Sequence, residues 1–241
     1  MLYEFRNATE TSEDLYIYGD IVSENVPDWD GNIDENAVDL KMFKDKTAAL
    51  GAGKTLNIYI NSGGGSVFAA SAMISMIKRA RDKGARVIAY VDGYAASAAS
   101  FFPMAADETH LYRNSMIMIH KPMSCLLGYY NATELIRCAE ALNAIEKGVM
   151  MSLYMDRAKI TEQKLRNMIA AETWLNADQI AETFDGFIIH DEVKDVAACT
   201  SKYFDRYLHT PDAAAAASSA KKPKPIDLSA YYEKIKELER M

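Results

Sequence analysis

The sequence predicts an α/β fold with a largely parallel sheet, because short apolar runs rich in β-formers alternate with helical patterns. The clearest strands are expected at residues 56–60 and 86–91. Between them, apolar residues recur with the helical period after Ser66, a residue type that caps helices, and Gly84 follows basic residues where such a helix would end. This strand–helix–strand order is typical of a parallel sheet covered by helices.

The remaining elements follow from the same periodicities. In chain order we expect a strand at 15–23, a loop at 24–35, a helix at 36–50, a helix opening at 93–100, strands at 108–112 and 116–120, helices at 130–157, 161–170 and 176–184, and a strand at 186–190. Residues 1–200 are therefore expected to form one compact domain. An Ala/Ser/Lys/Pro-rich stretch predicts a linker at 201–226, and the apolar spacing in residues 227–241 predicts a terminal amphipathic helix.

Composition limits the classes of function. The 241-residue chain is 49% hydrophobic and carries a formal net charge of −7, which gives no support for a nucleic-acid or anionic-membrane partner. No apolar run approaches the ~20 residues that span a bilayer, and the first twenty residues contain no signal-type apolar stretch. Cys125, Cys138 and Cys199 form no CxxC pair, so neither a disulfide framework nor a zinc site is indicated. We therefore expect a cytoplasmic protein.

Three segments have the residue types of a nucleophilic active site. NSGGG at 61–65 joins a strand to a helix, and its glycine amides are suited to binding an oxyanion. GYAASAAS at 93–100 places Ser97 among small residues at a helix start, and MIMIHKP at 116–122 ends a strand with His120, a candidate base. Taken singly, each has a structural alternative: a flexible turn, a packing device and a structural histidine. GAGKT at 51–55 is not a phosphate loop, since Ala48 stands where the first glycine is required.

The order INSGGGSV, GYAASAAS, NSMIMIHKP and TWLNADQIAE resembles the Clp peptidase family over residues 15–195, and most closely its phage-encoded relatives that act in head maturation. The resemblance implies a ClpP/crotonase-like fold of repeated β-β-α units with a long handle helix at 130–157. It also implies a serine endopeptidase. Ser97 matches the family's nucleophile, His120 its base, and the amides of Gly65 and Ala98 its oxyanion donors.

The family's catalytic acid corresponds to Glu172 here, two residues before the aromatic of E-T-W-L, where aspartate is the usual residue. Asp178 and Asp156 remain alternatives. Gly63 replaces the proline of the family's SPGG loop, which predicts a more mobile loop, and Lys121 replaces a common glutamine.

The resemblance implies no metal or cofactor, a polypeptide substrate such as a capsid or scaffold protein, and a homo-oligomeric ring. The chain begins close to its first strand, without the N-terminal segment by which Clp peptidases meet an unfoldase, so we do not expect an ATPase partner. The expected location is the bacterial host cytoplasm or the phage prohead. Three alternatives stay open: a housekeeping Clp-type peptidase with an ATP-dependent unfoldase, a crotonase-like acyl-CoA enzyme, and a non-catalytic assembly subunit.

Overall fold

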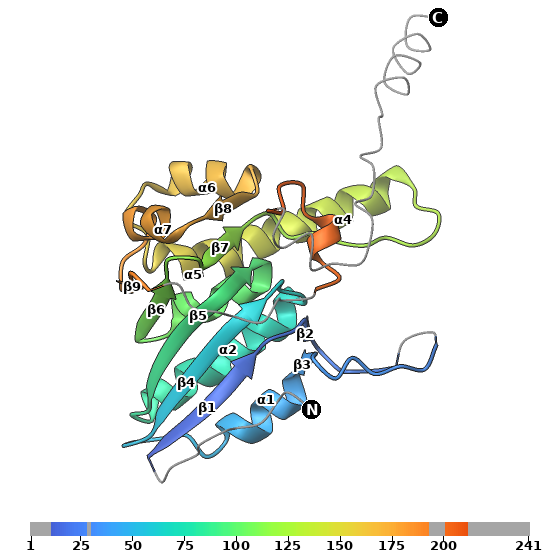
Figure 1. Ribbon diagram of the computed structural model, residues 1–241. Coiled ribbons are helices and arrows are strands. Elements are labelled where there is room, and N and C mark those ends of the chain that lie inside the picture. The colour runs from blue at the N-terminus through green and yellow to red at the C-terminus, as the bar shows by residue number, and fades with distance from the viewer. Residues whose placement is uncertain (1–10, 28–29, 193–200, 212–241) are drawn as a thin grey trace, which may run out of the picture.

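The computed structural model describes residues 11–27, 30–192 and 201–211, and these residues form an α/β structure around a mostly parallel sheet (Figure 1). The sheet has the strand order β1-β4-β5-β6-β9, with β7 pairing in parallel with the end of β5 and antiparallel with β8. Its strands are β1 (Ser12–Ile17), β4 (Thr55–Ser62), β5 (Arg86–Ala96), β6 (Glu108–Tyr112), β7 (Met116–Ile119), β8 (Thr173–Leu175) and β9 (Phe187–His190). A small parallel pair, β2 (Ile21–Val22) and β3 (Val38–Asp39), stands beside it. The predicted fold class is confirmed.

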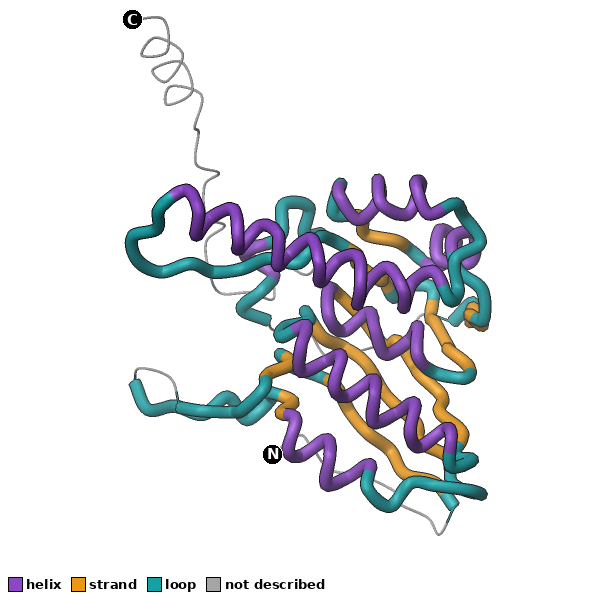
Figure 2. The backbone as a smooth tube through the Cα atoms, turned by 180° about the vertical axis from the view of Figure 1, so that it is seen from behind, coloured by secondary structure: helices purple, strands orange, loops and turns teal. Residues whose placement is uncertain are grey.

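Helices cover one face of this sheet, as the view from behind shows (Figure 2). The helices are α1 (Leu40–Thr47), α2 (Val67–Asp82), α3 (Phe101–Ala105), α4 (Ala132–Ile145), α5 (Met151–Met155), α6 (Glu162–Ala170) and α7 (Ala177–Thr183). The core lies between α2 and the central strands: Met73, Ile74 and Ile77 of α2 are buried with Ile58 and Val87. Ser66 caps α2 by accepting a hydrogen bond from the amide of Ala69, as the sequence predicted.

Residues 93–96 continue β5, where the sequence predicted the opening of a helix. Tyr94, Ala95 and Ala96 pair with β7, and Ala95 also pairs with Ser62 of β4. A 3-10 turn at Ser97–Ser100 and the short α3 follow. Alanine and serine favour a helix locally, but strand pairing on both sides overrides that preference. As a result Ser97 stands at the carboxyl end of a central strand.

The predicted long helix at 130–157 is present, but it is divided. α4 is followed by a π-helical turn at Glu146–Met150 and then by α5. α5 buries Met151, Leu153 and Tyr154, whereas α4 buries none of its residues and projects from the domain (Figure 1). A capping box between Asn131 and Glu134 fixes the start of α4.

The predicted linker began at residue 201, but residues 201–211 pack against the domain, and we call this segment the strap. Phe204 and Tyr207 of the strap are buried in a cluster with Ala96 and Met118. These two aromatic side chains explain the difference, because burying them stabilises a segment whose remaining residues are mostly polar. The predicted linker residues 212–226 and the predicted helix at 227–241 lie outside the described residues.

Candidate active site

Ser97 stands on a strained turn between β5 and the helical segment that follows. Its φ angle is +53°, a left-handed conformation that is uncommon for residues other than glycine. The Ser100 hydroxyl donates to the carbonyl of Ser97 at 2.5 Å and also lies 2.7 Å from the Tyr154 hydroxyl. This buried contact holds the turn in shape, so the hydroxyl of Ser97 is presented at the sheet edge.

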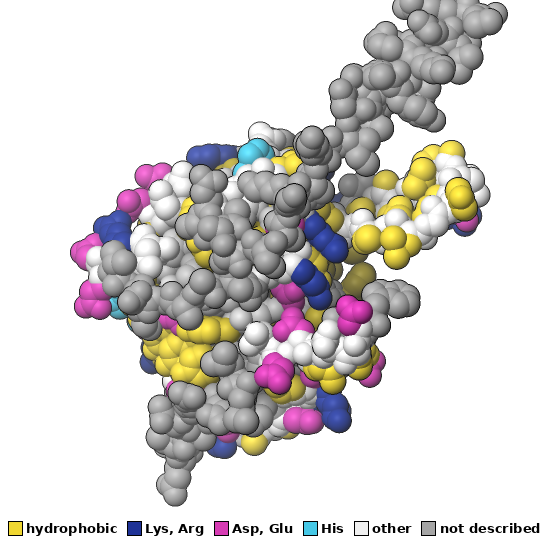
Figure 3. All heavy atoms as spheres, turned by 45° about the vertical axis from the view of Figure 1, so that its right-hand side comes forward, with side chains coloured by type: hydrophobic (Ala, Val, Ile, Leu, Met, Phe, Trp, Pro, Cys, Tyr) yellow, Lys and Arg dark blue, Asp and Glu magenta, His cyan; other side chains and the backbone are white. Residues whose placement is uncertain are grey.

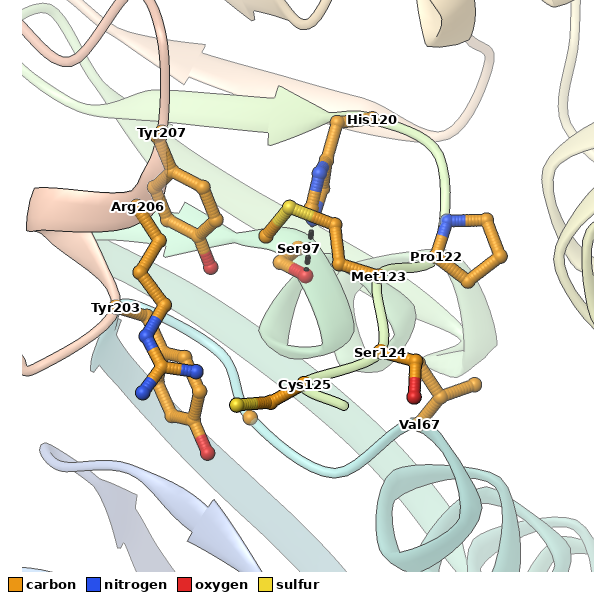
Figure 4. A pocket seen from close by; sticks show the side chains of 11 residues that line it. Val67, Ser97, His120, Pro122, Met123, Ser124, Cys125, Tyr203, Arg206 and Tyr207 are labelled. Atoms are coloured by element: carbon orange, nitrogen blue, oxygen red, sulfur yellow. Dashed lines mark hydrogen bonds between the residues drawn. The ribbon is translucent and has the colours of Figure 1, made fainter. Parts of the chain in front are cut away.

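His120 follows β7 and directs its imidazole at Ser97. The distance between Ser97 Oγ and His120 Nε2 is 2.7 Å, which is a hydrogen bond of ordinary length (Figure 4). Because β5 and β7 are parallel neighbours, the residues that follow them meet at the same end of the sheet. The sequence predicted both residues, and the structure brings them together.

Burial controls the protonation of this histidine. His120 is 6% exposed, and burial lowers its pKa to about 4, while the negative charge of Glu172 acts in the opposite direction. At neutral pH the ring is therefore uncharged. A neutral imidazole next to a serine hydroxyl is able to accept the proton of that hydroxyl.

Both predicted oxyanion donors lie beside Ser97, because Gly65 lines the same pocket and Ala98 follows Ser97 in the chain. Ile21 and Gly65 form a parallel bridge, in which Ile21 bonds to Gly64 and Ser66, so the amide of Gly65 points away from that strand. Gly65 lines the same pocket as Ser97. Ala98 is in the first turn of its 3-10 helix, where an N–H group has no intrahelical partner.

Glycine is required at both Gly64 and Gly65, because each has a positive φ angle and no space for a Cβ atom. Gly64 has a φ angle of +99°, and a Cβ atom there would lie 2.6 Å from the carbonyl oxygen of Ala96 and 2.8 Å from Ser97 Cβ. Gly65 has a φ angle of +144°, and its Cβ would lie 2.1 Å from the carbonyl oxygen of Ile21. The hydroxyl of Ser62 accepts the amide of Gly64 at 3.1 Å and so closes the turn. The backbone is thereby brought against the nucleophile.

Glu172, the predicted acid, is next to His120 because of strand register. The antiparallel strands β7 and β8 pair Ile119 with Thr173, so the residue just before β8 falls opposite the residue just after β7, the histidine. The carboxylate of Glu172 is buried and accepts the amides of Leu208 and His209 at 2.8 and 2.6 Å. No hydrogen bond between Glu172 and His120 occurs among the described residues. Its charge acts on His120 through space, and its catalytic role stays a prediction.

The other predicted acids are elsewhere. Asp178 binds Arg113 at the surface, at 2.5 Å, and Asp156 is exposed at the end of α5. Lys121 pairs with Glu146 at 3.5 Å. Among the described residues neither aspartate contacts the histidine, whereas the charge of Glu172 acts on it, so Glu172 is the acid that the fold places beside it.

A pocket of about 420 Å³ opens beside the serine and the histidine (Figure 4). Its lining residues are Gly65, Val67, Ser97, His120, Pro122, Met123, Ser124, Cys125, Tyr203, Arg206 and Tyr207. Three of these belong to the strap, which sequence reasoning assigned to a linker. The hydroxyl of Tyr207 donates to the carbonyl of Gly63 at 2.5 Å and points toward Ser97. Burial raises the pKa of Tyr207, and an interaction with the Ser97 hydroxyl acts against that rise.

In the part of the chain that the structure describes, no group of three His, Cys, Asp or Glu side chains is arranged to hold a metal ion. Within the same residues, no helix has the length and apolar character needed to cross a bilayer. Cys125 and Cys138 are free thiols, and Cys199 lies outside the described residues.

A parallel α/β sheet with a serine, a neutral histidine and a glycine turn at its carboxyl end defines a hydrolase-type site. The family model for Clp protease matches residues 33–193, more than half of the chain. The protein therefore belongs to the Clp protease family, and its sheet and helices have the ClpP-like fold. Membership supports a peptidase activity. No curated protein matches the chain significantly in sequence.

Proposed function

We propose that this protein is a serine endopeptidase in which Ser97 is the nucleophile and His120 the general base. The observation that carries the proposal is the 2.7 Å contact between Ser97 Oγ and the nitrogen of a buried, uncharged imidazole at the mouth of a pocket. A serine hydroxyl becomes an effective nucleophile only when a base is within hydrogen-bond reach. Family membership supports the same reaction class.

The reaction proceeds by acyl transfer to water. His120 takes the hydroxyl proton while Ser97 Oγ bonds to the peptide carbonyl carbon, and the amides of Gly65 and Ala98 bind the resulting oxyanion. The C–N bond then breaks, and His120 gives its proton to the leaving amine. Water attacks the acyl-enzyme in the same way and releases the acid. Glu172 stabilises the imidazolium that forms in each half of the cycle.

A fluorophosphonate tests this assignment directly. The expected result is one covalent adduct per chain on Ser97, located by mass spectrometry, absent in Ser97→Ala and reduced about 100-fold in rate in His120→Ala. Ser75→Ala is the matched control, because Ser75 is exposed on α2 and its hydroxyl donates to the carbonyl of Ser71 in the same helix. An adduct on another serine, or none on correctly folded protein, would refute the proposal.

We further propose that the protein assembles into a homo-oligomeric ring through the handle, by which we mean α4 and the loop at 123–131 before it. Apolar side chains are exposed there: Leu127 is 84% exposed, Leu135 48% and Ile136 59%. The space-filling view shows this projection with apolar side chains along it (Figure 3). Contiguous exposed apolar surface of this kind marks a protein interface.

Sedimentation tests the ring. The wild type should have a mass several times 26.8 kDa, and the double variant Leu135→Asp with Ile136→Asp should have a lower mass. A wild-type monomer would refute the ring.

The biological substrate that we propose is a capsid or scaffold polypeptide during head maturation of a phage. The support is the resemblance of the motifs around Ser97, His120 and Glu172 to those of phage-encoded relatives. Co-expression with the capsid and scaffold proteins of the same genome should yield shortened products, and Ser97→Ala should abolish them. Unchanged processing in that variant would refute this substrate assignment and leave the chemistry of the site unaffected.

A further inference from the structure

The strap is fixed against the active site at both ends. At one end, the Ser201 hydroxyl donates to buried Asp20 at 2.5 Å, and Lys202 lies 3.8 Å from the same carboxylate. At the other end, the amides of Leu208 and His209 bind Glu172. These contacts join the strap to residues far away in the sequence. These contacts therefore hold the strap in place as one wall of the pocket.

Gly63 makes the close approach of the strap possible. A Cβ atom at Gly63 would lie 2.2 Å from Ser201 Oγ and 2.5 Å from Ser201 Cβ, so any larger residue would collide with the strap. The carbonyl of Gly63 accepts the Tyr207 hydroxyl. The Clp-type motif has proline at this position, and the structure supplies a reason for glycine other than loop mobility: Ser201 occupies the space beside it.

Arg206 presents a positive charge to the pocket from this wall. Its guanidinium lies 5.5 Å from the centre of the Tyr203 ring, and among the described residues it forms no ion pair with a carboxylate. The two buried carboxylates nearby have their own donors, since Asp20 binds Ser201 and Glu172 binds the strap amides. Among the described residues, no carboxylate lines the pocket.

The charge balance of the pocket follows from these contacts. His120 is uncharged at neutral pH because burial lowers its pKa. Arg206 is thus the charged side chain that faces a bound substrate, in a protein whose overall net charge is −7. A guanidinium held over an aromatic ring is oriented and binds carboxylates with two parallel hydrogen bonds.

We propose that Arg206 is a specificity-determining residue, which selects a substrate with an acidic side chain at the residue whose carbonyl Ser97 attacks. The proposal rests on the proposed peptidase function and names the substrate chemistry of that same site. The residue lies outside the segment that the family model matches, which ends at residue 193. The preference is consequently a property of the strap and not of the shared domain.

Peptidyl diphenyl phosphonates test the proposal without a known cleavage site, because Ser97 Oγ bonds to their phosphorus with loss of phenoxide while the chosen side chain is in place. Three probes that differ only in carrying Glu, Gln or Lys at that residue are compared by their second-order inactivation rates. We expect the Glu probe to react at least about fivefold faster than its Gln isostere. Arg206→Gln should remove this difference, Arg206→Lys should retain most of it, and Arg206→Glu should favour the Lys probe.

Lys164→Gln is the matched control, since it removes the same charge from an exposed residue of α6 that does not line the pocket and does not anchor the strap. It should retain the preference for Glu. Equal rates for all three probes in the wild type would overturn the role of Arg206 and leave the serine peptidase intact. Failure of every probe and of the fluorophosphonate to label Ser97 would overturn both proposals.

Discussion

The two segments that enclose Ser97 are built in opposite ways. The glycine loop at 61–65 is short, directly joins β4 to α2, and is held by backbone geometry, with positive φ angles at Gly64 and Gly65. The strap is held by side chains, through Ser201 on Asp20 and Tyr207 on Gly63. The function of the glycine loop therefore depends on the exact placement of its backbone. The properties of the strap, as one wall of the pocket, depend on its side chains.

The largest effect is expected at Gly64. In Gly64→Ala the new Cβ would lie 2.6 Å from the carbonyl oxygen of Ala96 and next to Ser97, so the oxyanion donors would be displaced. Fluorophosphonate labelling should slow by about 100-fold or more, as when an oxyanion donor is lost. Gly53→Ala is the control, since Gly53 also has a positive φ angle of +77° but has open space around it. Equal labelling rates in the two variants would contradict this account.

A second effect, on stability, is expected from His120. Its pKa of about 4 in the folded protein lies below the ~6.5 of an unfolded histidine, so between these pH values the unfolded chain binds more protons. The free energy of unfolding should therefore rise as pH increases from about 4 to 6.5, by up to about 3 kcal/mol from this group. This part of the free energy of unfolding would be lost as the pH falls through the same range.

Urea denaturation of the wild type and of His120→Gln between pH 4 and 6.5 isolates the contribution of His120 to the free energy of unfolding, because other groups titrate equally in both proteins. Above pH 7, the free energy of unfolding should depend on pH in the same way in both. Labelling by fluorophosphonate should likewise stay fast down to pH 5, because the base remains unprotonated there. A labelling rate that falls with an apparent pKa near 6.5 would show that the histidine is not desolvated.

The smallest effect is expected at Gly63, where a substitution alters the strap and leaves the glycine turn in place. Gly63→Ala would place Cβ against Ser201, so the strap should move outward and the preference for the Glu probe over the Gln probe should fall toward one. Fluorophosphonate labelling, which needs no side-chain recognition, should change less than about twofold. Gly51→Ala, with its nearest neighbouring atoms at 4.0 Å, is the control. An unaltered preference would show that the strap and Gly63 are not coupled.

The contrast between the glycine loop and the strap also explains which parts of the site could be predicted from the sequence. Ser97 and His120 follow apolar runs that end at the same edge of a parallel sheet, so local patterns were enough to identify them. The extension of β5 to Ala96 was missed because strand pairing overrides the helix preference of alanine.

The strap was missed for a different physical reason. Its anchors are contacts between residues far apart in sequence, such as Asp20 with Ser201, separated by 181 positions. Phe204 and Tyr207 have a helical spacing, but the run is too short to establish an element, and the residues after them have a linker-like composition. Gly63 was the local feature that pointed to a difference here. Glycine in place of proline predicted a changed loop, but it did not indicate that the strap occupies the space beside position 63.

Gly63 and Ser201 also form a pair of positions at which a side chain on the first excludes the second from its present place. A chain that gained a side chain at position 63 would have to give up the strap, and a chain that lost the strap would be free to accept proline there. The geometry therefore predicts glycine at this position of the Clp-type motif in any relative whose chain places a segment where the strap lies here.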